Sequence, residues 1–325
     1  MKVIQVGIGG MGNAWLRTVL DSSDVSYAGF VEVSDKIAAE QVQKWGIDGS
    51  KIFKSLEEAM KNVQADGVIN VTPPQFHKAV SITALEAGIP VLSEKPLAGT
   101  LEEAQDIVDA ANRTGVLHMV TQNYRYHQPL HTLKRTLVNG PCGEIGAAHV
   151  EFFKGPHFGG FREEMPYPLI IDMSIHHFDL MRFLLGSDPV EVYGRSWNPP
   201  WSWYRGDASA SVTLKFASGA TISYDGSWCS QGRETPWNAN WRFECAKGVV
   251  AMVDDKVYTQ LTGQEAVLVE PIPMERMAQA YLLNEFYEAV TQGKPPATTC
   301  QDNIKSLGIV FNVVKSFETG QVVRF

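Results

Sequence analysis

The fold of this chain is decided close to its N-terminus by the stretch KVIQVGIGGMG, residues 2–12. Residues 2–6 are a short run rich in β-branched side chains, which predicts a buried strand. Glycines follow at once with the spacing GxGxxG, and a helical pattern comes next. A dinucleotide-binding loop requires this order of strand, turn and helix. We expect Gly7 to permit the tight turn, Gly9 to let a pyrophosphate approach the backbone, and Gly12 to let the helix pack on the strand.

An acidic residue lies 20 positions beyond the last of these glycines. Glu32 falls in the second predicted strand, residues 26–33, where its carboxylate can accept hydrogen bonds from both hydroxyls of a ribose. The same charge would repel a 2′-phosphate, and Val33 and Ser34 follow it rather than an arginine. NAD is therefore favoured over NADP. The alternative is a glycine-rich turn that binds no nucleotide.

Two patterns of secondary structure follow one another along the chain. The first third alternates strands with single helices, which indicates parallel βαβ units covered by helices on both faces. Residues 144–253 contain mostly strands, with one clear helix at about 172–185. We predict an α/β Rossmann domain with a doubly wound parallel sheet over residues 1–122. An α+β domain with a large, mostly antiparallel sheet is expected over 123–325, for substrate binding and oligomerisation. Its C-terminal helix can pack back on the first domain.

Composition excludes several classes of protein. The chain has 325 residues and a net charge of −8, and it has no Lys/Arg-dense stretch, so nucleic acid is not an expected partner. Its apolar runs are shorter than the roughly 20 residues of a membrane span. The first glycine turn comes too early for a signal peptide. Four scattered cysteines without a CxxC pair indicate reduced thiols and no metal site. We therefore expect a cytoplasmic protein.

Two further motifs end predicted parallel strands, the edge where doubly wound folds bind ligands. Thr72 and Pro73 close the third strand, and His77 begins the next helix. Glu94 and Lys95 close the fourth strand and precede a proline that stiffens the backbone. Each motif has an ordinary alternative, because a Pro-Pro sequence is usually only a turn and most lysines are solvated. Glu94 could bind a cofactor hydroxyl or pair with Lys95.

The predicted helix of the second domain opens with another candidate group. Asp172 and His176 are four residues apart and share one helix face, while Asp179 lies a further turn along. A carboxylate beside a histidine can orient the imidazole as a general base requires. Alternatively, Asp172 caps the helix and His176 is a core residue. Metal binding by this pair lacks a third ligand with convincing spacing.

Taken in order, these motifs resemble the glucose-fructose oxidoreductase/inositol dehydrogenase (Gfo/Idh/MocA) family over essentially the whole chain. The resemblance implies that Lys95, Asp172 and His176 are catalytic. Many members carry a Gly-Gly pair shortly before the aspartate, whereas this chain has Met165-Pro166-Tyr167-Pro168, which bears on the shape of the substrate pocket. The motifs and the resemblance together give the expected NAD(P)-binding residues: Gly7, Gly9, Met11, Gly12, Glu32, Thr72, Pro73, His77, Glu94, Lys95 and Gln122.

The substrate is less well defined by the sequence. The family resemblance implies a polyol, inositol, sugar or glycoside. Arg125, His157 and Arg162 are candidate substrate-binding residues that could supply polar contacts near the nicotinamide, although surface ion pairs are an equal alternative for the arginines. Tryptophans cluster in the second domain and could stack on a sugar ring, but we favour core or interface positions for most of them. The cluster comprises Trp197, Trp201, Trp203, Trp228, Trp237 and Trp241.

Three functions are compatible with the sequence. The first is an NAD-dependent dehydrogenase in which His176 removes a hydroxyl proton and Lys95 stabilises the developing alkoxide. The second is a glycoside hydrolase or lyase that reduces and reoxidises NAD within one turnover. Some relatives that resemble this fold cleave glycosides in that way. The third is a ligand sensor on the same scaffold, which would not need a base. We also predict a homodimer or homotetramer, because the second sheet has few helices to cover an apolar face.

Overall fold

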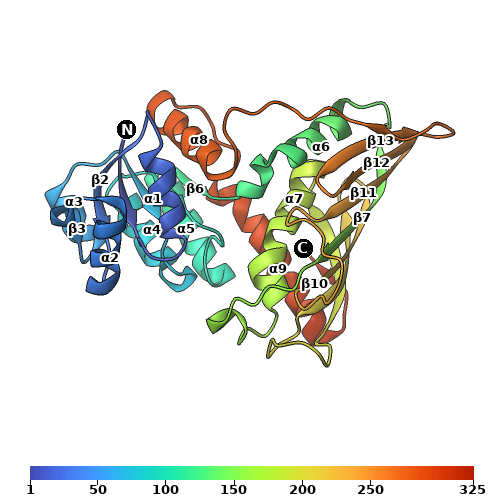
Figure 1. Cartoon of the computed structure of the whole chain (residues 1–325), viewed down its shortest axis with the longest axis horizontal. Coiled ribbons are helices and arrows are strands. Elements are labelled where there is room, and N and C mark those ends of the chain that lie inside the picture. The colour runs from blue at the N-terminus through green and yellow to red at the C-terminus, as the bar shows by residue number, and fades with distance from the viewer. The chain divides into compact units, whose positions relative to one another are not determined.

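The computed structural model describes every residue from Met1 to Phe325, and the chain divides into two compact units (Figure 1). Unit 1 comprises residues 1–123 and 276–304, and unit 2 comprises residues 124–275 and 305–325. The first boundary thus lies one residue beyond the one expected from the sequence. The segment 276–304, which we assigned to the second domain, belongs to unit 1.

Unit 1 contains a six-stranded parallel sheet in the order β3-β2-β1-β4-β5-β6. This is the strand order of a doubly wound dinucleotide-binding sheet, whose direction of winding reverses between β1 and β4. The predicted Rossmann fold is confirmed, although β3 is only two residues long and was not expected. The strands are β1 (Lys2–Val6), β2 (Ser26–Val31), β3 (Ile52–Phe53), β4 (Gly67–Asn70), β5 (Val91–Ser93) and β6 (His118–Val120).

Three helices of unit 1, α2, α3 and α5, begin at side-chain caps that the sequence provides. The side chains of Ser34, Ser55 and Thr100 each accept a hydrogen bond from the backbone amide three residues ahead. Gly46 and Gly115 end their helices in the left-handed conformation that glycine adopts without strain. The helices are α1 (Gly12–Leu20), α2 (Asp35–Trp45), α3 (Leu56–Asn62), α4 (His77–Glu86), α5 (Leu101–Thr114) and α8 (Ala278–Gln292), with 3-10 turns η1 (Gly49–Lys51) and η2 (Pro74–Phe76).

Two contacts explain why residues 276–304 belong to unit 1. A Cβ atom built on Gly67 would lie 2.8 Å from the ring of Phe286, so the absence of a side chain in β4 lets α8 pack closely. The backbone amide of Val120 donates to the carbonyl oxygen of Thr298 at 2.8 Å. The chain just before α9 (Cys300–Thr319) therefore extends the edge of the sheet at β6.

Unit 2 contains a nine-stranded sheet in the order β14-β13-β12-β11-β7-β10-β9-β8-β15. Every neighbouring pair is antiparallel except β7 and β10, which are parallel, so the expected mostly antiparallel sheet is confirmed. The strands are β7 (Ile145–Phe153), β8 (Pro189–Trp197), β9 (Ser209–Phe216), β10 (Thr221–Ser227), β11 (Asn240–Cys245), β12 (Gly248–Val253), β13 (Lys256–Leu261), β14 (Val267–Leu268) and β15 (Val323–Arg324).

Helices cover one face of this sheet, as Figure 1 shows for α6 (Gln128–Asn139), α7 (Ile175–Leu185) and α9. Three short helical turns complete this part of the chain: η3 (Asn123–Tyr126) precedes α6, and η4 (Gly160–Arg162) and η5 (Leu169–Ser174) lie between β7 and α7. No helix of the chain combines the length and the apolar character that crossing a membrane requires.

At its centre, the other face of the sheet is polar. Strands β7 and β9 alternate buried and exposed residues, and their exposed positions include His149, Glu151, Thr213 and Lys215. The continuous exposed apolar face that we expected is therefore not found on these strands, because their alternation turns the apolar side chains inward to the helices. Self-association stays a prediction, without that physical reason for it.

The tryptophan cluster does not share one environment. Trp228 and Trp241 are 1% exposed and fill the core of unit 2, in agreement with the interpretation favoured from the sequence. By contrast, Trp197, Trp201 and Trp237 are 40–57% exposed, so the core does not account for them.

Candidate functional site

The glycine loop shows the close contacts expected at its first and last glycines. Gly7 has a φ of +88°, and a Cβ there would lie 2.7 Å from the carbonyl oxygen of Val71. A Cβ on Gly12 would lie 2.6 Å from the carbonyl oxygen of Gly7, so the start of α1 packs against the loop. The nearest atom to a Cβ on Gly9 is a methyl carbon of Ile37 at 3.7 Å. The protein itself does not crowd Gly9, so its role in letting a pyrophosphate approach stays a prediction.

Two buried side chains hold this loop in shape. The Gln5 amide donates to the carbonyl oxygens of Gly7 and Gly12, both at 3.0 Å. Glu32 accepts from the backbone amides of Ile8 at 3.3 Å and Ser34 at 2.9 Å. The Glu32 carboxylate therefore lies beside the glycine loop, where a ribose would follow a pyrophosphate.

The Thr72 turn is organised by Asn70, the last residue of β4. The Asn70 side-chain oxygen accepts from the hydroxyl of Thr72 at 2.7 Å and from its backbone amide at 3.3 Å. Pro73 then leads into η2. The ring nitrogens of His77 lie 2.7 Å from the carbonyl oxygen of Pro96 and 2.8 Å from that of Thr72. His77 thus joins the turn after β4 to the turn after β5.

Glu94 and Lys95 occupy the end of β5. One carboxylate oxygen of Glu94 accepts from the indole nitrogen of Trp15 at 2.8 Å, and the other accepts from the backbone amide of Lys95 at 3.1 Å. Glu94 is buried and anchors the turn that carries Lys95. Lys95 itself is only partly exposed, so it is not a freely solvated surface charge.

The residues of unit 1 fit a dinucleotide. Gln122 follows β6 at the same edge of the sheet, and its amide nitrogen and oxygen are both buried without a hydrogen-bond partner. Leaving both groups unmatched is unfavourable, so a polar ligand at this edge would satisfy them. Met11, which precedes α1, is 51% exposed beside the open Gly9 position.

In unit 2, Asp172 lies in a π-helical turn rather than at a helix cap. This turn, η5, covers Leu169–Ser174, and α7 begins only at Ile175. The helix expected from Asp172 onward therefore starts with a wider turn, a feature frequent at functional sites. Asp172 accepts a 2.6 Å charge-assisted bond from Nε of Arg162. Its interpretation as the helix cap is wrong.

His176 occupies the first turn of α7 and is 6% exposed. Its ring stacks on Tyr124, with centroids 4.2 Å apart and planes 24° from parallel. The neighbouring His177 is fully buried, with ring nitrogens 3.2 Å from the hydroxyl of Tyr224 and the carbonyl oxygen of Trp237. Burial lowers the pKa of His177 to about 4, so this histidine is neutral at physiological pH.

The three predicted substrate contacts have different surroundings. Arg125 is buried and forms two hydrogen bonds to Asp179, at 2.6 and 2.7 Å. This geometry gives Arg125 a structural partner within unit 2. Arg162 lies over the rings of Phe158 and Phe161 while it pairs with Asp172. His157 is exposed, and its ring stacks on Trp203 with centroids 3.8 Å apart.

Sequence reasoning missed three residues that organise these sites. Asn70, Trp15 and Tyr124 each contact a predicted site residue, yet none belongs to a motif. For Tyr124 a signal was present, since it lies between Gln122 and Arg125 just after a strand end. Trp15 donates to Glu94, which is 79 residues away in the sequence, and no local pattern predicts this contact.

Comparison with known proteins gives one consistent family. A family model described as "Oxidoreductase family, NAD-binding Rossmann fold" matches residues 1–122, and "GFO/IDH/MocA C-terminal domain" matches residues 130–254. The chain is 29% identical to the scyllo-inositol 2-dehydrogenase (NAD(+)) of Bacillus subtilis, over 98% of this chain and 94% of that protein. It is 25% identical to the 1,5-anhydro-D-fructose reductase of Ensifer adhaerens, over 98% and 97%.

A solved structure supports the same fold. An oxidoreductase from Agrobacterium radiobacter, crystallised with NAD⁺, L-tartaric acid and magnesium, superposes with a TM-score of 0.91. That likeness covers 100% of this chain and 98% of the other at 20% sequence identity. The matched domains, the strand order and the glycine loop agree with one another. The chain belongs to the Gfo/Idh/MocA family of oxidoreductases, with an NAD-binding Rossmann domain.

Proposed function

We propose that the protein is an NAD-dependent dehydrogenase that oxidises a secondary hydroxyl group of a cyclic polyol or sugar. The observation that carries this proposal is the glycine loop with its carboxylate. Gly9 is open to a ligand, while Glu32 is fixed beside the loop by the amides of Ile8 and Ser34. When bound, NAD would supply the hydride acceptor.

His176 is the proposed general base. Its position at the start of α7, 6% exposed and stacked against one aromatic face, suits a group that must keep one orientation. In oxidation it takes the proton of the substrate hydroxyl, and in reduction the imidazolium returns it. Asp172, held by Arg162, is proposed to bind a neighbouring hydroxyl or to orient His176.

Lys95 is the proposed electrostatic stabiliser. Its turn is fixed from two sides, because Glu94 binds the Lys95 backbone amide and His77 binds the carbonyl oxygen of Pro96. An ammonium group held in this way favours the developing alkoxide more than the neutral alcohol, which is the requirement for lowering the barrier.

The substrate class rests on relatives and on the polar groups of unit 2. Two relatives that align over nearly the whole chain are named inositol dehydrogenases, and a third is named an anhydro-sugar reductase. Asp172, Arg162 and His157 offer the carboxylate, guanidinium and imidazole groups that recognise hydroxyls. The flanking Trp203 and Phe158 would suit the apolar face of a ring.

Substitution of His176 tests this function. With NAD and scyllo- or myo-inositol, His176→Ala should lower kcat by roughly a hundredfold or more, the usual scale for a positioned base. The matched control is His149→Ala, an exposed histidine on the polar face of the sheet that bonds to Ser223. Equal turnover in the wild type and His176→Ala would refute the assignment of the base.

A further inference from the structure

Tyr124 contacts three histidines of unit 2 and is assigned no role by the motifs. It lies in η3, the turn that follows β6, and it is partly buried. Its ring stacks on His176, meets His177 edge-on with centroids 6.4 Å apart, and lies 4.7 Å from the ring of His127. The stacked partner is the residue proposed as the base.

Tyr124 remains a neutral phenol at physiological pH. Burial raises the pKa of Tyr124, and the nearby carboxylates of Asp172 and Asp255 raise it further. The ring therefore presents an uncharged aromatic face to His176. Such a face restricts rotation of the imidazole and stabilises the cation that forms when His176 takes a proton.

The position of Tyr124 is fixed by its neighbour Arg125. The guanidinium of Arg125 binds both carboxylate oxygens of Asp179, and the two side chains are only 6% and 1% exposed. Asp179 lies three residues after His176 on α7, close to one helical turn. Turn η3 is therefore joined to α7 at two adjacent points, one aromatic and one ionic.

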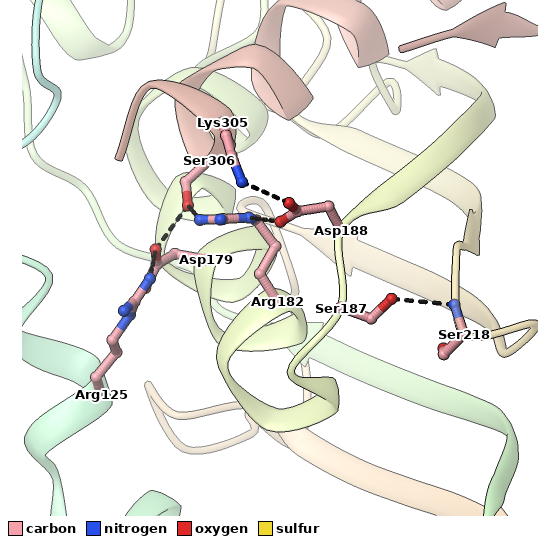
Figure 2. Close-up of polar contacts among 8 residues, drawn as sticks. All are labelled: Arg125, Asp179, Arg182, Ser187, Asp188, Ser218, Lys305 and Ser306. Atoms are coloured by element: carbon pink, nitrogen blue, oxygen red, sulfur yellow. Dashed lines mark hydrogen bonds and ion pairs between the residues drawn. The ribbon is translucent and has the colours of Figure 1, made fainter. Parts of the chain in front are cut away.

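Figure 2 shows that Asp179 is itself held from the opposite side. The hydroxyl of Ser306 donates to Asp179 at 2.6 Å, and Ser306 accepts from Arg182 at 2.8 Å. Arg182 and Lys305 both bind Asp188, at 2.7 and 2.8 Å. The side chain of Ser187, beside Asp188, also accepts from the backbone amide of Ser218. These bonds link α7 and α9 to each other and to the residue before β8, through the two carboxylates of Asp179 and Asp188. A bidentate, buried pair with further hydrogen bonds has far less freedom than a surface ion pair.

We propose that Tyr124 is a positioning residue that fixes the imidazole of His176 by stacking. The buried Arg125–Asp179 pair keeps the Tyr124 ring in place against His176. The inference deepens the proposed function, because it concerns the residue assigned there as the base. Tyr124 acts through His176 and is given no contact with the substrate.

Two substitutions separate the ring from the hydroxyl group. Tyr124→Phe keeps the stacking face, whereas Tyr124→Leu removes it at similar bulk. Because small displacements of a catalytic group are costly, we expect Tyr124→Leu to lower kcat about tenfold to a hundredfold, while Tyr124→Phe stays within about twofold. The dissociation constant for NADH should not change in either variant, since the predicted NAD-binding residues are in unit 1.

NADH binding counts the molecules in which unit 1 is folded, and kcat is expressed per binding site. Wild-type kcat per site in Tyr124→Leu would overturn the proposal. An equal loss in Tyr124→Phe would also overturn it, because the hydroxyl group would then be responsible.

A spectroscopic measurement on the wild type does not depend on activity. Protons stacked over an aromatic ring move upfield in NMR spectra, and the His176 ring protons can be assigned from their absence in His176→Gln. We expect an upfield shift in the wild type and in Tyr124→Phe. No upfield shift in the wild type would overturn the stacking, whatever the kinetics show. Failure of the proposed function would appear differently, as full turnover by His176→Ala.

Discussion

The Nδ1 atom of His77 lies 2.7 Å from the carbonyl oxygen of Pro96, the residue that follows Lys95. Its other ring nitrogen lies 2.8 Å from the carbonyl oxygen of Thr72. Both partners can only accept, and a neutral imidazole has one N–H, so the imidazolium alone can donate to both. Burial lowers the pKa of His77, and the opposing effects of the two carbonyl oxygens and of Glu94 are smaller, so the net direction is downward.

His77→Asn tests whether this histidine positions the turn that carries Lys95. Because a buried carbonyl would lose its donor, we expect NADH binding to weaken about tenfold and kcat to fall by a similar factor. The measurement is a fluorescence titration with NADH together with steady-state kinetics. His149→Asn, at an exposed site, is the control. A folded His77→Asn protein with the wild-type dissociation constant and kcat would contradict this role.

Glu32→Gln tests the preference for NAD. The carboxylate is expected to bind two ribose hydroxyls, and hydrogen bonds to a charged group are the stronger kind, so NAD affinity should fall by roughly tenfold. NADP should bind better than it does to the wild type, because the charge that repels a 2′-phosphate is gone. Dissociation constants for both nucleotides give the ratio, with the exposed Glu40→Gln on α2 as the control. If the ratio of the two dissociation constants stayed the same as in the wild type, Glu32 would not determine the preference for NAD.

Much of unit 1 could be predicted from the sequence because its signals are local. The Gly7, Gly9 and Gly12 spacing indicated which backbone positions exclude a Cβ, and the structure shows close contacts at the first and last of them. Strand β3 escaped prediction because two residues carry no periodicity. It exists because the backbone amide of Glu32 binds the carbonyl oxygen of Phe53, a contact between distant segments.

The second unit was less predictable because its determining contacts are long-range. Arg125 binds Asp179, which is separated from it by 54 positions in the sequence. Ser306 binds the same carboxylate across a separation of 127 positions. The π-helical turn at Asp172 was also missed. Its sequence reads as an ordinary helix start, and the hydroxyl of Ser174 bonds to the carbonyl oxygen of Leu169, five residues back.

Arg162→Gln tests the importance of the pair with Asp172. This pair is partly buried, with side-chain exposures of 36% and 18%. Removal of Arg162 leaves Asp172 without its 2.6 Å partner, so we expect the KM for the polyol to rise about tenfold, the loss of roughly one hydrogen bond to a charged group. The KM for NAD should stay constant. Arg205→Gln is the matched control, because its pair with Glu164 is exposed and should contribute little. Equal effects of the two substitutions would contradict the prediction.

The buried His177 predicts a loss of stability in acid. Its pKa is about 4 in the folded protein against an ordinary value of 6.5, so below pH 6.5 protons bind the unfolded chain first. The stability that the folded protein gains from keeping His177 neutral is fully present above pH 6.5. It is lost as the pH falls toward 4. Between pH 6.5 and 5 the free energy of unfolding should decrease by about 2 kcal/mol from this group.

Urea unfolding of the wild type and His177→Gln at pH 7.5 and 5.0 measures this loss. The decrease in the free energy of unfolding should be smaller in the variant, and His149→Gln should retain the wild-type decrease. The same decrease in the wild type and His177→Gln would show that other groups cause the acid sensitivity.

The most direct test of the central claim follows NADH absorbance after mixing the protein with NAD and a panel of inositols, aldoses and glycosides. The account predicts steady NADH formation with at least one inositol or sugar, and its loss in Lys95→Ala. Cleavage of a glycoside without net NADH, or tight NADH binding with no reaction across the panel, would contradict the proposed dehydrogenase.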